Sequence, residues 1–519
     1  MNRLRSQVTF TFVTLGILCI ILASIFHQAQ SIGGATWDEA SNHARIKAQL
    51  DLAKRWISGD SNAHFSQLPG HTTAHYGIVS VFPAYLAEKL AKSYKLANPR
   101  GVYTYFLHAT AFACYLLTLI FTYLILIRVP VRQSTALIGT GLLAIFPLWI
   151  GFSFFDFKDV PTAAFATMAL YASIGLLQTD DEREKIIGFT GLLALATILI
   201  AGIKIAALLL IVPSWLAAFF VLVRRRRVGT LLSLCILSAV GIFAVTPVAW
   251  SDPTNYISAS LTLMARHPWS RCTLTNGDCM SPVSADWSAN RYIWAWFIAQ
   301  TPVLIGIGAI GGLVMAPRKG LVATTIATSA VLPLILIIVR NSTLYDGLRQ
   351  LLFEVPLVFI LSTMFWHDVV CRSGLFIVGI FCIVAQFGLF MWDNVALFPY
   401  NYVYYNLPTR QIADDRNFET DFWGFSLKEA AELPAVTHSS SIVIGNPKHL
   451  VAPFLPRERT IVSMEVAAKL ARFTDAVLIS YMRWRPMPVW CSDPEYVVRR
   501  LPLGGRPLHL SFAAHCVTE

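Results

Sequence analysis

Long apolar runs recur along this chain and restrict what it can fold into. Most are about 20 residues long with few charges, the length an α-helix needs to cross a bilayer. Of the 519 residues, 55% are hydrophobic and only 14% are charged, which excludes an ordinary soluble domain. The pattern predicts an all-α polytopic membrane protein with about eleven transmembrane helices. They are Val8–Phe26, Tyr103–Ile127, Thr135–Phe154, Val160–Leu177, Ile186–Ile203, Ile205–Val223, Gly229–Trp250, Tyr292–Met315, Leu321–Val339, Leu351–Trp366 and Leu375–Trp392.

Lys and Arg in the short connections predict the orientation of these helices. Such residues accumulate in cytoplasmic loops. With the N-terminus inside, the inner loops hold Arg3, Arg5, Arg128, Arg132, Arg183, Lys185, Arg224–Arg227, Arg318, Lys319 and Arg372. The formal net charge of +11 is spread over such loops, and no nucleic-acid-binding pattern accompanies it. We expect a multi-pass protein of the inner (plasma) membrane, surrounded by membrane lipids, with a cytoplasmic N-terminus and no nucleic-acid partner.

Two large regions should then lie outside the membrane. Residues 1–392 are predicted to form the transmembrane module, in which the extracytoplasmic loop 28–101 carries two helices lying in the interface, Glu39–Ile57 and Tyr76–Leu96. Residues 393–519 are predicted to form a small extracytoplasmic α/β domain. Its expected strands are Ser441–Ile444, Thr460–Ser463, Ala476–Tyr481, Tyr496–Leu501 and Leu508–Phe512, and its expected helices are Ser426–Leu433 and Met464–Phe473.

Four of the nine cysteines fall on the outer side in two pairs. Cys272 and Cys279 share one loop, and Cys491 and Cys516 share the tail. An oxidising compartment favours two disulfides over four free thiols. No Cys-x-x-Cys pattern points to a zinc or iron–sulfur site.

Asp38 and Glu39 follow the first apolar run, behind the flexible Gly33-Gly34 pair. A carboxylate at this place could accept a proton from a hydroxyl or amine, and Glu39 could orient a ligand or hold a metal ion. Equally, both acids could simply favour the N-terminus of the helix Glu39–Ile57. The sequence leaves both interpretations open.

A second charged segment, Asp156-Phe157-Lys158-Asp159, precedes a predicted span on the same side. Three charges in four positions are more than a helix end requires, so Lys158 could bind a phosphate and an acid could position a sugar hydroxyl or a metal ion. Pro161 suits a first helical turn, and capping with interfacial anchoring is the alternative.

Further cations and polar groups are predicted at the same face. Lys204 joins two spans and could bind an anion or snorkel. Arg349, in the segment that begins at Tyr345, could grip a phosphate through two hydrogen bonds or anchor the interface. His75 is a further candidate ligand, although a lone histidine is more often structural. The span interiors hold almost no charge, which favours chemistry at the membrane surface over transport through the bundle.

The order of these features resembles the GT-C glycosyltransferases, which are polytopic enzymes that use polyprenyl-phosphate sugars. The resemblance rests on an Asp-Glu pair after the first span, a Lys-Asp-x-Pro that begins a later span, and an Arg-containing loop before a late span. The segments Tyr402–Asn406 and Phe418–Ser426 add to it. Within the superfamily, the branch of protein O-mannosyltransferases and lipid A aminoarabinose transferase is most similar. The family's Gly-Gly after the Tyr-Asn segment is absent here.

The resemblance implies roles for individual residues. Asp38 would be the catalytic base, while Glu39, His75, Lys158, Asp159, Lys204, Tyr345 and Arg349 would bind substrate. A divalent metal is the one cofactor considered, at Asp38, Glu39 or Asp159, because family members differ in metal dependence. No strong general acid is required, since a lipid phosphate leaves as a stable anion.

The predicted function is therefore an inverting glycosyltransferase. It would move a sugar from a polyprenyl-phosphate donor to an extracytoplasmic acceptor, such as lipopolysaccharide, another envelope glycan or a protein hydroxyl. The alternatives are a lipid-linked sugar flippase or transporter and a non-catalytic envelope-assembly protein.

Overall fold

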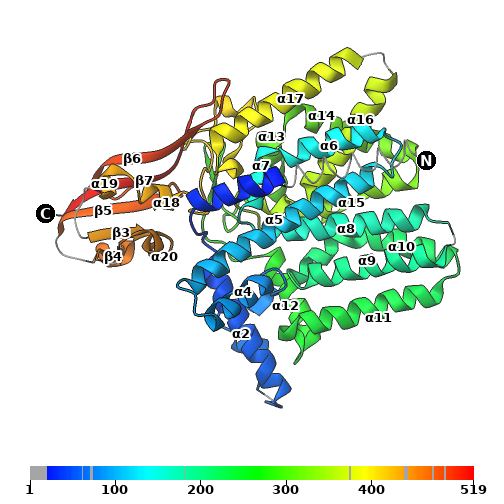
Figure 1. Cartoon of the computed structure of the whole chain (residues 1–519), viewed down its shortest axis with the longest axis horizontal. Helices are drawn as coiled ribbons and strands as arrows, with labels where there is room; N and C mark the ends of the chain where they lie inside the picture. The colour runs from blue at the N-terminus through cyan, green and yellow to red at the C-terminus, as the bar shows by residue number, and fades with distance from the viewer. Residues whose placement is uncertain are drawn as a thin grey trace.

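A bundle of apolar helices makes up most of the molecule (Figure 1). The computed structural model describes residues 20–60, 62–70, 74–180, 182–372, 376–437, 442–456, 458–469, 473–483 and 487–518. Within these ranges, eight helices are long and apolar enough to cross a membrane. They are α5 (Pro99–Leu126), α8 (Asp159–Gln178), α9 (Arg183–Ala201), the helix Ile205–Arg224 that contains α10 (Val212–Arg224), α11 (Val228–Val245), α15 (Leu321–Val339), α16 (Glu354–Arg372) and α17 (Phe376–Leu397). This is a multi-pass membrane protein, as predicted, and the total of eleven spans stays a prediction.

Two predicted spans are broken helices in the structure, and whether each broken pair crosses the membrane stays a prediction. Residues 133–153 form α6 (Gln133–Ala144) and α7 (Pro147–Ser153), bent by 62°. Residues 289–315 form α13 (Ala289–Gln300) and α14 (Val303–Met315). A proline follows each break, Pro147 or Pro302, and proline drives the preceding residue out of helical geometry. The first predicted span begins outside the described residues, which start within the helix Ile20–Ile32.

Shorter helices cover one end of the bundle. They are α2 (Glu39–Ile57), with the predicted bounds, α4 (Phe82–Ser93) and α12 (Pro253–Ala265). α4 begins later than predicted because the chain before it pairs with the turn after α9. Gly77 N donates to Ile203 O at 2.9 Å and Val79 N to Gly202 O at 3.0 Å. A Cβ on Gly77 would lie 2.0 Å from Gly202 O, so this pairing requires glycine.

The C-terminal part contains the predicted α/β domain. Its five strands are β3 (Ile442–Asn446), β4 (Thr460–Ser463), β5 (Phe473–Tyr481), β6 (Cys491–Arg500) and β7 (Pro507–Thr518), in the order β4-β3-β5-β7-β6. β3 pairs in parallel with β4 and β5, and β7 runs antiparallel to β5 and β6. Four short helices accompany them, α18 (Leu427–Ala430), α19 (Pro434–Thr437), α20 (Lys448–Val451) and α21 (Met464–Ala467). The predicted helices Ser426–Leu433 and Met464–Phe473 are thus shorter in the structure.

Both expected disulfides are present. Cys491 and Cys516 face each other across β6 and β7. Cys272 and Cys279 close the hairpin of β1 (Thr273–Thr275) and β2 (Asp278–Met280).

A fully buried ion pair joins the tail to the bundle. Arg410 donates two hydrogen bonds to Asp393 of α17, at 2.9 and 2.8 Å, and both side chains are 0% exposed. Arg410 also donates to Pro502 O of the β-domain at 3.1 Å. Removing one partner of such a pair leaves an uncompensated buried charge, which commonly costs about 3–5 kcal/mol. This contact fixes the sheet against the same end of the bundle that carries α2.

Candidate functional site

A turn from the tail holds the loop that carries Asp38. Asp421 is fully buried, and its carboxylate accepts hydrogen bonds from Trp423 N, Gly424 N and Ser426 N at 2.8–3.0 Å. This turn accepts two backbone hydrogen bonds from the loop: Gly34 N donates to Phe425 O at 2.9 Å, and Trp37 N donates to Trp423 O at 3.1 Å. A Cβ on Gly33 would lie 2.0 Å from the Phe425 ring, so glycine is needed for this close approach.

Asp38 forms an ion pair with Lys158, which lies just before α8. Burial alone would raise the pKa of Asp38, but the charges of Lys158, Arg349 and Arg45 together lower it below its usual value. The side chain of Asp38 keeps 21% exposure, against 6% for Asp159. Asp38 is therefore an ionised carboxylate that a second molecule can reach.

Glu39 faces the opposite way, towards α5. Its carboxylate accepts from Thr36 N at 2.6 Å and from Thr104 Oγ1 at 3.1 Å, and it lies 2.9 Å from His108 Nε2. Burial works against the charge, yet His108 and, to a smaller extent, Thr36 lower the pKa of Glu39. Both Glu39 oxygens are occupied, which favours an anchoring role over the predicted substrate contact.

The Asp-x-Lys-Asp segment splits between two roles. Asp156 Oδ1 accepts from Lys158 N at 3.0 Å and Asp159 N at 2.8 Å, so it caps the start of α8. Burial, with the nearby charge of Asp159, raises the pKa of Asp156 to about 7. Lys158 and Asp159 instead direct their side chains to the cluster described next.

A chain of alternating charges runs from α8 to the tail. Asp159 pairs with Lys204 and lies 3.5 Å from Arg349 Nε. Arg349 Nη1 donates to Asp346 Oδ2 at 2.9 Å, and Asp346 pairs in turn with Arg483 of the β-domain. Among the described residues, Asp159 Oδ2 and Arg349 Nε are buried without a hydrogen-bond partner. The two atoms face each other at 3.5 Å as an ion pair without a well-formed hydrogen bond, which an anionic ligand at Arg349 would replace.

The ring of Tyr76 joins Asp38 and Lys158 to this chain. The Nζ atoms of Lys158 and Lys204 lie 5.2 and 5.8 Å from its centroid, and the guanidinium carbon of Arg45 lies at 5.6 Å. A ring face attracts cations at such distances. Burial lowers the pKa of Lys204, but Asp159 and Tyr76 more than offset this and raise it. Three cations thus converge on one aromatic ring.

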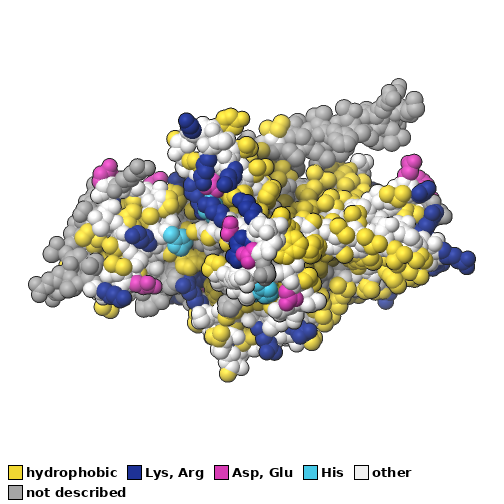
Figure 2. All heavy atoms as spheres, turned by 90° about the horizontal axis from the view of Figure 1, so that it is seen from below, with side chains coloured by type: hydrophobic (Ala, Val, Ile, Leu, Met, Phe, Trp, Pro, Cys, Tyr) yellow, Lys and Arg dark blue, Asp and Glu magenta, His cyan; other side chains and the backbone are white. Residues whose placement is uncertain are grey.

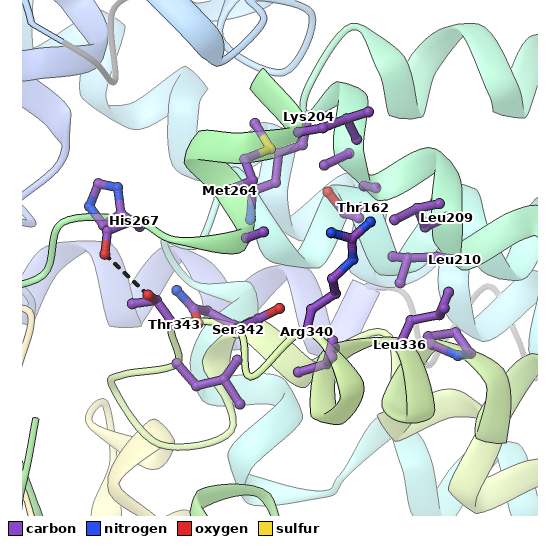
Figure 3. A pocket seen from close by; sticks show the side chains of 18 of the residues that line it. Thr162, Lys204, Leu209, Leu210, Met264, His267, Leu336, Arg340, Ser342 and Thr343 are labelled. Atoms are coloured by element: carbon purple, nitrogen blue, oxygen red, sulfur yellow. Dashed lines mark hydrogen bonds between the residues drawn. The ribbon is translucent and has the colours of Figure 1, made fainter. Parts of the chain in front are cut away.

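A cavity of about 670 Å³ opens beside the cluster. Tyr76, Asp159, Lys204 and Tyr345 line its polar end. Figure 3 shows Leu209, Leu210 and Leu336 along its wall, and Arg340, which follows α15, extending its guanidinium into it towards Thr162. In the described part of the chain no acid pairs with Arg340. The cavity therefore combines an apolar wall with a cationic end.

Of two further predicted ligands, His75 lies away from the cavity and Tyr345 lines it. His75 Nδ1 lies 2.8 Å from Ser260 Oγ, and its ring stacks on Tyr256, so it packs between α12 and the loop before α4. Tyr345 does line the cavity; its ring stacks on Trp269 at 4.1 Å and lies under the Arg349 guanidinium at 5.0 Å.

The predicted metal ligands do not converge. Asp38 pairs with Lys158, Asp159 with Lys204, and Glu39 faces α5. Within the described ranges, no group of three or more His, Cys, Asp or Glu could hold a metal ion. The arrangement does not fit a metal at these three acids, and no step is derived through one.

Three arginines of the site are not predicted from the sequence. Arg45 and Arg340 lie on elements predicted only as an interfacial helix and a span end, and Arg483 lies in the tail, 137 residues from its partner Asp346. Arg45 carried a usable signal, since it is an arginine on the apolar side of α2, next to buried Ile46. Nothing local marks Arg483.

Comparison with known proteins supports the fold. No protein-family model matches the chain, and no curated protein sequence matches it. Two crystal structures of ArnT from Cupriavidus metallidurans do match. The one bound to undecaprenyl phosphate is 12% identical with a TM-score of 0.50, covering 97% of this chain and 98% of that chain. The apo structure is 13% identical with a TM-score of 0.46, covering 75% and 66%. The chain thus has the fold of ArnT, and the resemblance predicted from the sequence is confirmed at the level of the fold.

Proposed function

We propose that this protein is a membrane glycosyltransferase that takes a sugar from a polyprenyl-phosphate donor. The observation that carries the proposal is the cationic end of an otherwise apolar cavity, next to an accessible carboxylate. A polyprenyl phosphate has the matching chemistry, an anionic head on an apolar chain. The ArnT structure of the same fold is bound to undecaprenyl phosphate, which supports this donor class.

The residues divide into two sets by what they can do. The donor phosphate is held by Lys204 and Arg349, and Lys158 and Arg340 lie nearby. Tyr345 packs beside the phosphate. Fixed cations in a site shielded from water stabilise the phosphate charge that develops as the sugar leaves. Asp38 accepts the proton of the acceptor. Asp159 and Asp346 keep Lys204 and Arg349 in place.

The transfer can then proceed in one step. The acceptor oxygen or nitrogen forms a bond to the anomeric carbon while the bond from that carbon to the phosphate oxygen breaks. The electron pair of that bond goes to the phosphate, and the acceptor proton goes to Asp38. Attack from the face opposite the leaving phosphate inverts the anomeric centre. The acceptor is a lipopolysaccharide, another envelope glycan or a protein.

The orientation of the chain is part of the proposal. Arg128, Arg132, Arg183, Arg318 and Arg372 lie at or next to the ends of α5, α6, α9, α14 and α16 that point away from the cluster. Figure 2 shows hydrophobic side chains covering the face between the two charged ends. The positive-inside rule then makes the Arg-rich end cytoplasmic, and the cluster and β-domain extracytoplasmic.

A comparison of envelope extracts tests the activity. Glycolipids and glycoproteins from cells with the intact chain, with Asp38→Asn and without the chain are analysed by mass spectrometry. A sugar-bearing species that appears only with the intact chain supports the proposal. Identical extracts from all three, at equal protein abundance, would contradict it. Movement of lipid-linked sugar across the membrane without a covalent product would favour a flippase instead.

A further inference from the structure

A second cavity lies at the opposite end of the bundle, between α9 and α11. It measures about 670 Å³ and is lined by Arg183, Ile187 and Thr190 of α9, by Arg226 and Arg227, and by Leu234 and Leu237 of α11. We call it the arginine cavity. Arg183 begins α9 while Lys204 follows its other end, so at 1.5 Å per residue about 30 Å separate this cavity from the cluster.

The cavity lies where the packing between α9 and α11 is open. Near the other end they are in close contact, since a Cβ on Gly241 would lie 2.2 Å from Ile198. At Gly191 and Gly229 an added Cβ would meet nothing within 4 Å. The gap is therefore open to the surrounding membrane along much of α11, which buries only 11% of its apolar window.

The lining combines cations with an apolar groove. Among the described residues, Arg183 and Arg226 have no ion-pair partner. The nearby acid Glu182 is occupied by Lys185 at 2.8 Å, and Arg225 donates to Asp180 O at 3.3 Å. Glu184 is exposed and does not line the cavity. No carboxylate in the described lining pairs with Arg183 or Arg226, so these two arginines are the groups that attract an anion.

Thr190 provides an independent indication of a ligand. It is only 6% exposed and lines the cavity, and its hydroxyl has no hydrogen-bond partner among the described residues. A buried hydroxyl without a partner is costly, in a membrane most of all. It lies seven residues from Arg183, or about 10 Å along the helix. A ligand that reaches both must carry an anionic head and polar groups further along an apolar body.

We propose that the arginine cavity binds one anionic phospholipid of the surrounding leaflet. Its phosphate lies between Arg183 and Arg226, a glycerol ester oxygen accepts the Thr190 hydroxyl, and an acyl chain follows Ile187, Leu234 and Leu237. Basic pockets between helices at the cytoplasmic side are suited to such headgroups. This site is separate from the proposed donor site, and its failure would leave the proposed transfer untouched.

Native mass spectrometry of the purified full-length chain tests the proposal. Phosphatidylglycerol and phosphatidylcholine with the same acyl chains are added separately. Wild type should retain one phosphatidylglycerol in preference to phosphatidylcholine. Arg183→Gln/Arg226→Gln should retain it about 30-fold less, since each arginine near an anionic head contributes roughly fivefold. Thr190→Val should lose about fivefold, the contribution of one hydrogen bond.

The matched control is Arg224→Gln/Arg318→Gln. It removes the same charge at the same end, but neither side chain lines the cavity, so retention should equal that of wild type. Equal losses in both double variants would overturn the proposal, as would equal retention of the two lipids. Inorganic phosphate that binds as tightly as the lipid would also overturn it, because the site would then recognise a free anion. Thermal melting that matches wild type excludes misfolding as the cause of a loss.

Discussion

Asp38 and Glu39 are neighbours in the sequence and serve two different regions of the molecule. Asp38 points to Lys158 and the cations around Tyr76, where its side chain remains partly accessible. Glu39 points to Thr104 and His108 of α5, where it is 3% exposed and fully hydrogen-bonded. An acidic pair at a helix start can therefore combine a reactive group with its own anchor.

The largest effect is expected at Asp38. Asp38→Asn keeps the shape of the side chain and removes the base, so the transfer rate should fall about 10²- to 10⁴-fold. The measurement is product formation at equal protein abundance. The thermal midpoint of the variant serves as the control for folding.

Arg483 is expected to act as a positioning residue. It pairs with Asp346, which pairs with Arg349, so Arg483→Gln should let Arg349 shift and lower kcat about 100-fold, the effect of an error of roughly 1 Å in placement. Arg483→Lys should restore part of kcat because it keeps the charge. If both variants lower the melting temperature equally and leave kcat unchanged, Arg483 contributes only to stability.

Replacing Glu39 should lower stability more than the transfer rate, the opposite of what is expected for Asp38. Glu39→Gln keeps the acceptor towards Thr36 and weakens the charge-assisted contact with His108, which should cost about 1–3 kcal/mol of stability. Transfer per folded molecule should change little. A rate loss as large as that of Asp38→Asn would remove the distinction between the two acids.

A pH dependence of stability, with no direct effect on transfer, is expected from Asp156. Its pKa is raised from 3.8 to about 7 in the folded protein, so the folded state binds this proton more tightly than the unfolded state. Stability from this group is therefore greatest below pH 4 and decreases as the pH rises towards 7, by at most about 1.4 kcal/mol per unit. Asp156→Asn should remove this part of the pH dependence of the melting temperature, and an unchanged slope would contradict the assignment.

Secondary structure could be predicted from the sequence where the residues that determine it are close together in the chain. The helix Glu39–Ile57 has acids at its start and apolar residues at helical spacing, and its observed bounds are the predicted ones. The five tail strands follow from short β-branched runs between turns. Pro147 and Pro302 also indicate the two helix breaks, but the length of each apolar run favours a single continuous span.

The candidate site was predictable only in part. Lys158, Asp159, Lys204 and Arg349 were expected at one face, and the structure brings them together. The choice between the two roles of Asp38 and Glu39 was left open, because it depends on which way each side chain leaves the same turn. Arg483 was missed because its partner lies in another domain, and only the folded chain brings them into contact.

The central claim is that Asp38 moves a proton while the nearby cations hold the phosphate. Its most direct test is the affinity of Asp38→Asn for undecaprenyl phosphate, measured on the same sample that has lost transfer. We predict wild-type affinity or slightly tighter binding, since Lys158 is released from its partner. An affinity that falls in proportion to the rate would contradict the claim, because Asp38 would then act in holding the donor.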